Sequence, residues 1–350
     1  TQLKNSSAKL FPKDTILMAM YGQGKTRGQV AKLGIEASTN QACAALLLND
    51  GFEVDYYYQY LVSQYENIRE LANSGGQQNL SAGIIKSVHI PIPPQLEQRK
   101  IAKILSTWDK AISTTERLID NSKQQKKALM QQLLTGKKRL LDDSGKPFEG
   151  EWEEVKLEGH INFLSGHAFK SSEFQKNAHY KLLRGINISQ GYLRWGEDQT
   201  HYWPVDEKFN KYILEKNDIV ISMDGSLVGR NYAIISAANI EPMLLVQRVA
   251  RLRCKSTLHC QYLLQHIASE HFKSYVDAVK TVTAIPHISA KDIKHFKIPL
   301  PSVEEQQKIA TVLTNADREI ELLEQQLADL KQEKKALMQQ LLTGKRRVKV

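Results

Sequence analysis

Cysteine is scarce in this chain, and its spacing excludes several kinds of site. The 350 residues contain 3 cysteines, Cys43, Cys254 and Cys260, and no two of them form a C-x-x-C pair. So few cysteines cannot build a disulfide framework, and the histidines near the last two do not complete a common zinc spacing. We therefore expect no metal site, and a reducing, cytoplasmic environment.

Long apolar runs are also absent. No stretch approaches the roughly 20 residues that a membrane span needs. The chain opens with TQLKNSSAKLF, which lacks the apolar region of a signal peptide. With 41% hydrophobic and 25% charged residues, the composition is that of a globular protein, and the length suggests two or three domains.

The net charge of +10 is confined to two segments. Residues 80–148 carry 13 Lys and Arg against 6 Asp and Glu, and residues 287–350 carry 12 against 9. The other segments are neutral. Bulk charge alone is thus weak support for nucleic-acid binding.

The two basic segments are copies of one another. A shift of 208 residues aligns 80–139 with 288–347 without a gap, and 31 of the 60 positions are identical. The segment KKALMQQLLTGK occurs unchanged at 126–137 and 334–345. Such self-similarity over a long period indicates a duplicated architecture.

Each copy predicts a short strand, a proline break and a long helix. HIPIP and KIPLP are the predicted strands; Ser302 and Glu305 match a capping box, and Gly136 and Gly344 match helix C-caps. Alternating spacings of four and three then mark a heptad seam in each helix of about 40 residues. The seam positions are Ile101, Leu105, Trp108, Ile112, Thr115, Ile119, Ser122, Lys126, Leu129 and Leu133 in the first copy, and Ile309, Leu313, Ala316, Ile320, Leu323, Leu327, Leu330, Lys334, Leu337 and Leu341 in the second. We expect the two helices to form an antiparallel coiled coil.

The remaining segments are related more weakly. FPKDTILMAMYGQGKTRGQVA at 11–31 resembles LEKNDIVISMDGSLVGRNYA at 214–233, and both predict a turn, a buried strand and a Gly-rich turn. The fold class expected is α/β: two strand-rich mixed α/β domains separated by the helix pair. The expected parts are 1–90 (first domain), 91–140 (central helix), 141–298 (second domain) and 299–350 (distal helix). Since 66 residues, 152–217, precede Asp218 in the second domain and only 13 precede Asp14, we expect the first domain to lack about 53 N-terminal residues.

This pattern resembles the DNA-specificity subunits of type I restriction-modification systems. The resemblance rests on the repeated helix starts IPIPPQLEQRKIAKIL and IPLPSVEEQQKIATVL, together with LEKNDIVISMDGS at 214–226, VQRVARL at 246–252 and AIPHIS at 284–289. It implies two target-recognition domains that each read half of a bipartite, asymmetric site in double-stranded DNA. It also implies docking of two methyltransferase subunits and of restriction-translocase subunits. The chain itself would carry no catalytic residues and no cofactor, and S-adenosylmethionine would be bound by the methyltransferase.

Candidate residues for these contacts are polar and basic side chains in turns and loops. Their side-chain types match base edges and phosphates. The DNA-binding candidates are Gln23, Lys25, Arg27, Lys170, Lys181, Arg184, Arg194, Lys208, Arg230, Thr281, Thr283 and His287. The partner-docking candidates, from the repeated segment, are Lys126, Lys127, Met130, Lys334, Lys335 and Met338.

Two other classes of function remain as alternatives. AMYGQGKT at 19–26 matches a relaxed phosphate loop, although RGQVAKLGIEA after it makes a poor helix; Asp218 and Asp224 flank a strand as nuclease carboxylates could. The other alternative is a coiled-coil scaffold that binds only proteins.

Overall fold

A computed structural model describes residues 9–22, 25–73, 79–236 and 241–349 of the chain. The chain divides into two compact units, Thr1–Asn121 with Glu321–Val350 (unit 1) and Ser122–Ile320 (unit 2). Two helices of 39 residues, α4 (Gln95–Leu133) and α8 (Val303–Leu341), contribute a segment to each unit. The lengths confirm the prediction of about 40 residues. In the described residues, no helix combines the length and the apolarity of a membrane span.

Unit 1 places small sheets against helices. Strands β3, β2 and β5 form an antiparallel sheet in that order, and β1 pairs with β4. The core joins the sheet residues Ile16 and Met18 to Tyr56, Ile101 and Leu341 from the helices. The elements are β1 (Leu10–Phe11), β2 (Ile16–Ala19), β3 (Val30–Lys32), β4 (Ala37–Ser38), β5 (Cys43–Leu46), α1 (Val54–Ser63), α2 (Tyr65–Asn73) and α3 (Ala82–Lys86).

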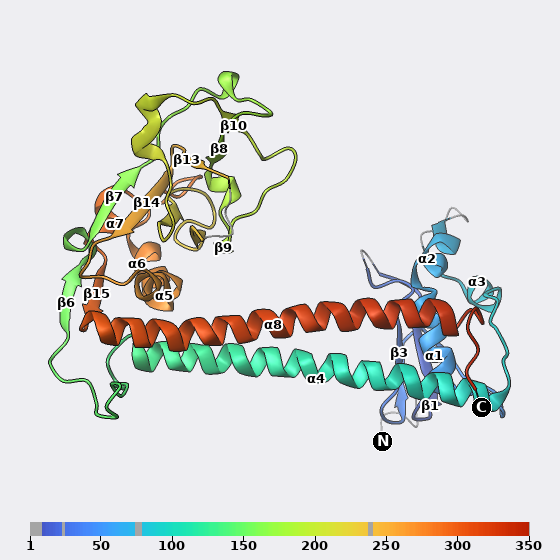
Figure 1. The fold of residues 1–350 in the computed structure, drawn as a ribbon. Helices are drawn as coiled ribbons and strands as arrows, with labels where there is room; N and C mark the ends of the chain where they lie inside the picture. Colours follow the sequence, from blue (N-terminus) through green and yellow to red (C-terminus); the bar gives the residue numbers. More distant parts are fainter. Residues whose placement is uncertain (1–8, 23–24, 74–78, 237–240, 350) are drawn as a thin grey trace. The chain divides into compact units, whose positions relative to one another are not determined.

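Unit 2 is larger and richer in strands. Its main sheet has the order β7-β14-β11-β12-β9, a second sheet has the order β10-β8-β13, and β15 pairs with β6. The strands are β6 (Glu153–Lys156), β7 (Ile161–Ser165), β8 (Tyr180–Leu183), β9 (Gln190–Gly191), β10 (Tyr202–Trp203), β11 (Ile219–Ser222), β12 (Tyr232–Ile234), β13 (Met243–Leu245), β14 (Val249–Cys254) and β15 (Lys297–Leu300). The helices are α5 (Cys260–Ala268), α6 (Glu270–Val279) and α7 (Ala290–His295), with 3₁₀ turns at Leu157–Gly159, Ser171–Glu173, Gly185–Asn187 and Glu207–Tyr212. The predicted mixed α/β class is confirmed (Figure 1).

The two units repeat the same three-stranded core. In unit 1, Ile16 of β2 lies opposite Lys32 on one side and Leu46 on the other. In unit 2, Ile219 of β11 lies in the same way opposite Ile234 and Leu252. The backbone hydrogen bonds made directly after β2 and β11 match as well. Met20 N–H donates to Ala42 O and Leu80 N–H to Met20 O, while Met223 N–H donates to Arg248 O and Ile288 N–H to Met223 O.

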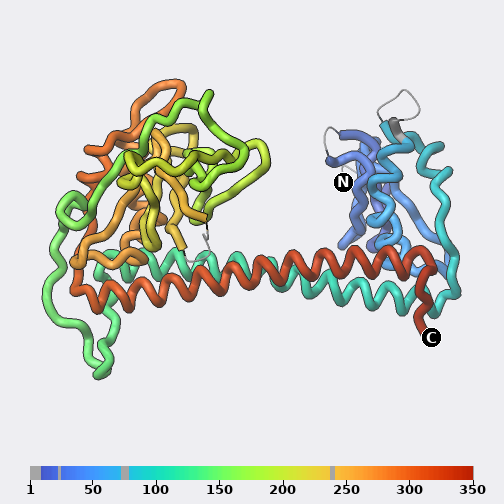
Figure 2. Tube along the Cα trace, turned by 45° about the horizontal axis from the view of Figure 1, so that its top comes forward, coloured from blue at the N-terminus to red at the C-terminus, as the bar shows by residue number. Residues whose placement is uncertain are grey.

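Within each unit the segments of α4 and α8 run side by side in opposite directions (Figures 1 and 2). In unit 1, Glu97 at the start of α4 pairs with Arg347 beyond the end of α8. In unit 2, Glu305 at the start of α8 pairs with Arg139 beyond the end of α4. All twenty seam positions are buried or half-buried. The antiparallel pairing is therefore confirmed within each unit, and the bounds of the four predicted parts remain a prediction.

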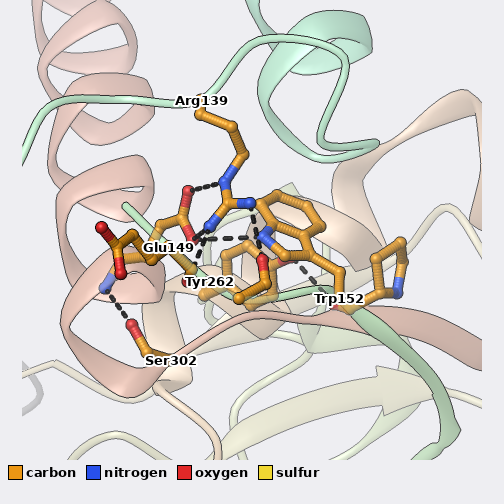
Figure 3. Close-up of polar contacts among 8 residues, drawn as sticks. Arg139, Glu149, Trp152, Tyr262 and Ser302 are labelled. Carbon is orange, nitrogen blue, oxygen red and sulfur yellow. Dashed lines mark hydrogen bonds and ion pairs between the residues drawn. The ribbon is translucent and has the colours of Figure 1, made fainter. Parts of the chain in front are cut away.

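Figure 3 shows the polar contacts around Arg139, Trp152 and Ser302 at the start of α8. Both carboxylate oxygens of Glu305 accept hydrogen bonds from Arg139, at 2.7 Å each, and Trp152 Nε1 donates to one of them at 3.1 Å. Arg139 also donates to the carbonyls of Gly150 and Glu149. The side chain of Glu305 is 1% exposed, so its charge depends on these donors.

Two local predictions were wrong. The capping box is only half formed: Ser302 Oγ accepts the Glu305 N–H, but the Glu305 carboxylate binds Arg139 instead of the backbone at Ser302. Segment 89–93, described throughout, forms no strand, whereas the matching β15 does. The difference lies in the available strand partner. β15 pairs with β6, which belongs to the front part of the second domain. In segment 89–93, the carbonyls of His89 and Pro91 instead accept hydrogen bonds from tyrosine hydroxyls of α1.

Both predicted C-cap glycines are confirmed. Gly136 has φ +70° and Gly344 has φ +72°, a left-handed conformation that other residues adopt at a cost. The ring of Trp152 also lies against Gly136, where an added Cβ would come within 3.2 Å of it. Gly136 therefore both ends α4 and admits this tryptophan.

Candidate DNA-recognition surface

Unit 2 contains a pocket of about 400 Å³ with several cationic side chains. Four segments supply it: the turn after β8, the segment after β9 that holds Arg194, the turn between β11 and β12, and the tight turn between β13 and β14. The lining residues are Arg184, Gly185, Ile186, Arg194, Ser222, Asp224, Gly225, Ser226, Leu227, Asn231, Val246, Gln247 and Arg248. Three arginines with Asn, Gln and Ser side chains form a set of donors and acceptors suited to base edges and phosphates.

The structure brings Arg184 and Arg194, both predicted from the sequence, to this pocket. Arg194 is exposed and its Nε donates to Ile186 O at 2.9 Å, which holds the side chain at the rim. Arg184 is half-buried, with its guanidinium 5.6 Å from the centre of the Phe174 ring.

Arg248, the third arginine, was not predicted. Its Nη1 lies 2.8 Å from Asp224 Oδ2, and its side chain is 60% exposed. Its backbone has φ +68°, a conformation that residues other than glycine adopt at a cost. The sequence did carry a signal, because Gln41-Ala42 and Gln247-Arg248 are matching turns of the two domains.

The predicted residues Thr281, Thr283 and His287 lie in a loop that contacts the pocket through its backbone, and none of the three is among the residues that line it. Asp224 forms an isolated backbone bridge with His287, and Gly225 N–H donates to Pro286 O at 3.0 Å. Within the loop, Thr281 Oγ1 accepts the His287 N–H, and the two threonine hydroxyls lie 3.3 Å apart. All three side chains are exposed.

Lys181 lies in a separate hollow of about 870 Å³ that includes Phe174, Trp195 and Tyr202. Its ammonium is 4.3 Å from the centre of the Trp195 ring and 2.7 Å from Glu241. With its side chain 16% exposed, this lysine is largely committed to contacts inside unit 2.

The other candidates in unit 2 lie outside both hollows, and each has an acidic neighbour. Lys170 pairs with Glu173, Lys208 with Asp206, and Arg230 with Asp277 at 3.6 Å. In unit 1, Lys25 is exposed, while Arg27 is only 9% exposed. Gln23 lies outside the described residues.

The docking candidates divide into two groups. Lys126 and Lys334 face the partner helix, where they form ion pairs with Asp317 and Asp109. Met130 is half-buried and Met338 is buried in the core of unit 1. Only Lys127 and Lys335 of the six are exposed.

The geometry contradicts the catalytic alternatives. A phosphate loop must open a helix, but the turn after β2 leads into β3, which pairs back onto β2. Asp218 is 1% exposed and accepts two hydrogen bonds from Arg253, at 2.7 and 2.8 Å, which raises the pKa of that arginine. Asp218 therefore has a structural role. No cluster of metal-binding side chains occurs among the residues that the structure describes.

The buried histidine of α5 is structural as well. His266 is 3% exposed and packs edge-on against Tyr262, with ring centres 4.6 Å apart. Burial lowers its pKa to about 3, so the ring is neutral near pH 7. A neutral imidazole within a core suits packing.

Comparisons with known proteins identify the family of the chain. The type I restriction modification DNA specificity domain model matches residues 1–122 and 149–332. The specificity subunit of the type I restriction enzyme MjaVIII from Methanocaldococcus jannaschii is 34% identical over 305 residues, which cover 84% of this chain and 71% of that protein. The type I restriction-modification S subunit from M. genitalium has the same fold, with a TM-score of 0.63, 20% identity, and coverage of 95% of this chain and 84% of that one. A second structure, described under complex assembly and conformational transition of the type I R-M system, has a TM-score of 0.56 and 17% identity, with coverage of 96% and 84%. The chain belongs to the family of type I restriction-modification DNA specificity subunits.

Proposed function

We propose that this specificity subunit reads a bipartite, asymmetric site in double-stranded DNA, one half through each strand-rich domain. The observation that carries the proposal is the repeated core. β3-β2-β5 and β12-β11-β14 share register and bonding, while the turns beside them differ in sequence. Two domains with equivalent three-stranded cores but different turns are suited to reading two different DNA sequences.

The two long helices would set the distance between the half-sites. Helices of 39 residues are about 60 Å long at about 1.5 Å per residue. In dimeric DNA readers a fixed separation of the reading elements determines the spacing of the half-sites. The same relationship would here arise within one chain.

The partners would be two methyltransferase subunits, with restriction-translocase subunits joining for cleavage. The repeated segments 126–137 and 334–345 keep identical exposed residues at equivalent places, among them Lys127 with Lys335 and Gln131 with Gln339. Identical surfaces suit two copies of one partner. The chain would supply specificity and no chemistry, S-adenosylmethionine would be bound by the methyltransferase, and the complex would act in the cytoplasm, where the DNA is.

A scaffold that binds only proteins is the rival function. Such a scaffold gives no reason for three arginines to surround one pocket in unit 2. DNA competition against the methyltransferase complex, in a salt series, separates the two because phosphate contacts weaken steeply with salt.

The experiment that tests the proposal replaces residues 150–284 with the corresponding segment of another specificity subunit. The methylated sites of the hybrid and of the parent are then mapped. One half of the recognised site should change and the other should remain. A change in both halves at once would show that the domains do not read the DNA independently.

A further inference from the structure

We propose that Arg248 is a specificity-determining residue that reads a guanine in the half-site contacted by unit 2. The inference rests on the proposed function and deepens it. An arginine fork can donate two parallel hydrogen bonds to O6 and N7 of guanine in the major groove, and no other base offers this pair of acceptors. Such a contact requires a guanidinium that is exposed, correctly oriented and firmly mounted.

The turn that carries Arg248 is held on both sides. Gln247 N–H donates to His167 O at 2.7 Å, and Arg248 O accepts the Met223 N–H at 2.8 Å. Next to the turn, Gly166 approaches so closely that an added Cβ would lie 2.1 Å from Val246 O. The backbone at Arg248 is therefore fixed by hydrogen bonds to the segments that directly follow β7 and β11.

The strained backbone supports a functional role. Arg248 has φ +68°, and a residue with a Cβ is less stable there than glycine. Two other described residues that are not glycine share this feature, Asp14 and Asn217, and they occupy equivalent turns of the two domains. Asp and Asn tolerate this conformation well, whereas a long basic side chain gains nothing local from it.

Asp224 orients the guanidinium. Its carboxylate accepts one hydrogen bond from Arg248 Nη1 and is itself 19% exposed, compared with 60% for the arginine. Asp224 is anchored through the Ser222 hydroxyl, which donates to its backbone carbonyl, and through the bridge to His287. One carboxylate contact restrains the side chain and leaves other N–H groups of the fork for DNA.

The first domain shows that this position varies. The bond from Met20 N–H to Ala42 O corresponds to the bond from Met223 N–H to Arg248 O, so Ala42 occupies the place of Arg248. The residue before it is glutamine in both domains, Gln41 and Gln247. The two turns share these hydrogen bonds but carry Ala in one domain and Arg, with a positive φ, in the other, a difference that suits two different half-sites.

The test compares Arg248→Ala and Arg248→Lys with the parent chain in the methyltransferase complex. Affinities are measured for duplexes carrying each of the four bases at each position of the half-site read by unit 2. Arg248→Ala should reduce the preference for guanine at one position by about 10- to 100-fold, with the preferences at other positions unchanged. Arg248→Lys, which keeps the charge and loses the fork, should lose most of that preference while retaining more of the overall affinity.

Two further variants make the outcome decisive. Arg318→Ala, at an exposed arginine of α8, controls for the loss of one charge and should leave every base preference unchanged. Arg248→Gly suits the positive φ and covers the case in which Arg248→Ala folds poorly. An equal loss of affinity for all four bases, or an unchanged profile, would overturn the role of Arg248. A parent complex that prefers no bipartite site at all would instead refute the proposed function.

Discussion

Lys334 Nζ lies 2.6 Å from Asp109 Oδ1 in unit 1, and the residues 208 positions away, Lys126 and Asp317, form the same ion pair in unit 2. Each aspartate also accepts a hydrogen bond from a glutamine side chain, Gln59 in one unit and Gln265 in the other. The first lysine of the repeated segment thus joins α4 to α8. Part of the identity of the two copies is explained by this internal role.

Docking of the methyltransferase should depend on the exposed second lysine. Lys127→Glu reverses a charge that lies outside the helix pair, so we expect one docking position to weaken and native mass spectra to show complexes with one methyltransferase. Lys335→Glu should weaken the other position. Unchanged two-to-one assembly in both variants would remove these lysines from the docking surface.

Glu305 should be far more important for stability than its neighbour. Glu305→Ala leaves Arg139 and the Trp152 N–H without their acceptor, and we expect a loss on the order of 3 kcal/mol. Glu304→Ala, at an exposed residue one position earlier, should change stability by less than about 0.5 kcal/mol. Denaturant unfolding of both variants checks this, and equal stabilities would contradict it.

Unit 2 should lose stability in acid because of His266. The pKa of His266 is about 3 in the folded protein and about 6.5 in an unfolded chain, so the unfolded state binds the proton more readily. The neutral His266 ring therefore contributes fully to the free energy of unfolding above about pH 6.5. This contribution is lost as the pH falls from there toward 3, by up to about 5 kcal/mol.

His266→Leu removes this titration and should flatten the pH dependence of the melting temperature in that range. Some dependence will remain, since burial also lowers the pKa of His259, and acidification will weaken the pair of Arg347 with Glu97, whose pKa the arginine lowers. A variant that melts with the same pH profile as the parent would contradict the assignment.

The helices should act as a ruler. Seven residues inserted after Ser122 in α4, with seven inserted after Glu319 opposite it in α8, preserve both seams and lengthen the pair by about 10 Å. At about 3.4 Å per base pair, we expect roughly three additional base pairs between the half-sites. Methylation mapping measures this, and an active variant with the original spacing would refute the ruler.

Much of the helical architecture could be predicted from sequence because its determinants are local. The heptad seam and the C-cap glycines depend on residues that are close together in the sequence. The 208-residue repeat can be found by comparing the two copies directly. The strand at 89–93 was predicted wrongly because a strand exists only with a partner, and β15 depends on the distant β6. The side chain of Glu305 was misassigned for the same reason, since Arg139 is 166 residues away.

The candidate site was predicted in part. Residue type identified Arg184 and Arg194, which line the pocket, and the loop at 281–287, whose backbone contacts Asp224 and Gly225 of the lining. Residue type could not separate these two arginines from Lys170 or Lys208, which do not line the pocket, because the loops that line it come together only in the folded chain. Arg248 was missed because its importance lies in the geometry of its turn.

Methylation-site mapping of the chain expressed with its methyltransferase subunits tests the central claim most directly. We expect one asymmetric motif with two specified halves, separated by a fixed number of unspecified base pairs. A single continuous motif, or methylation without sequence preference, would contradict it.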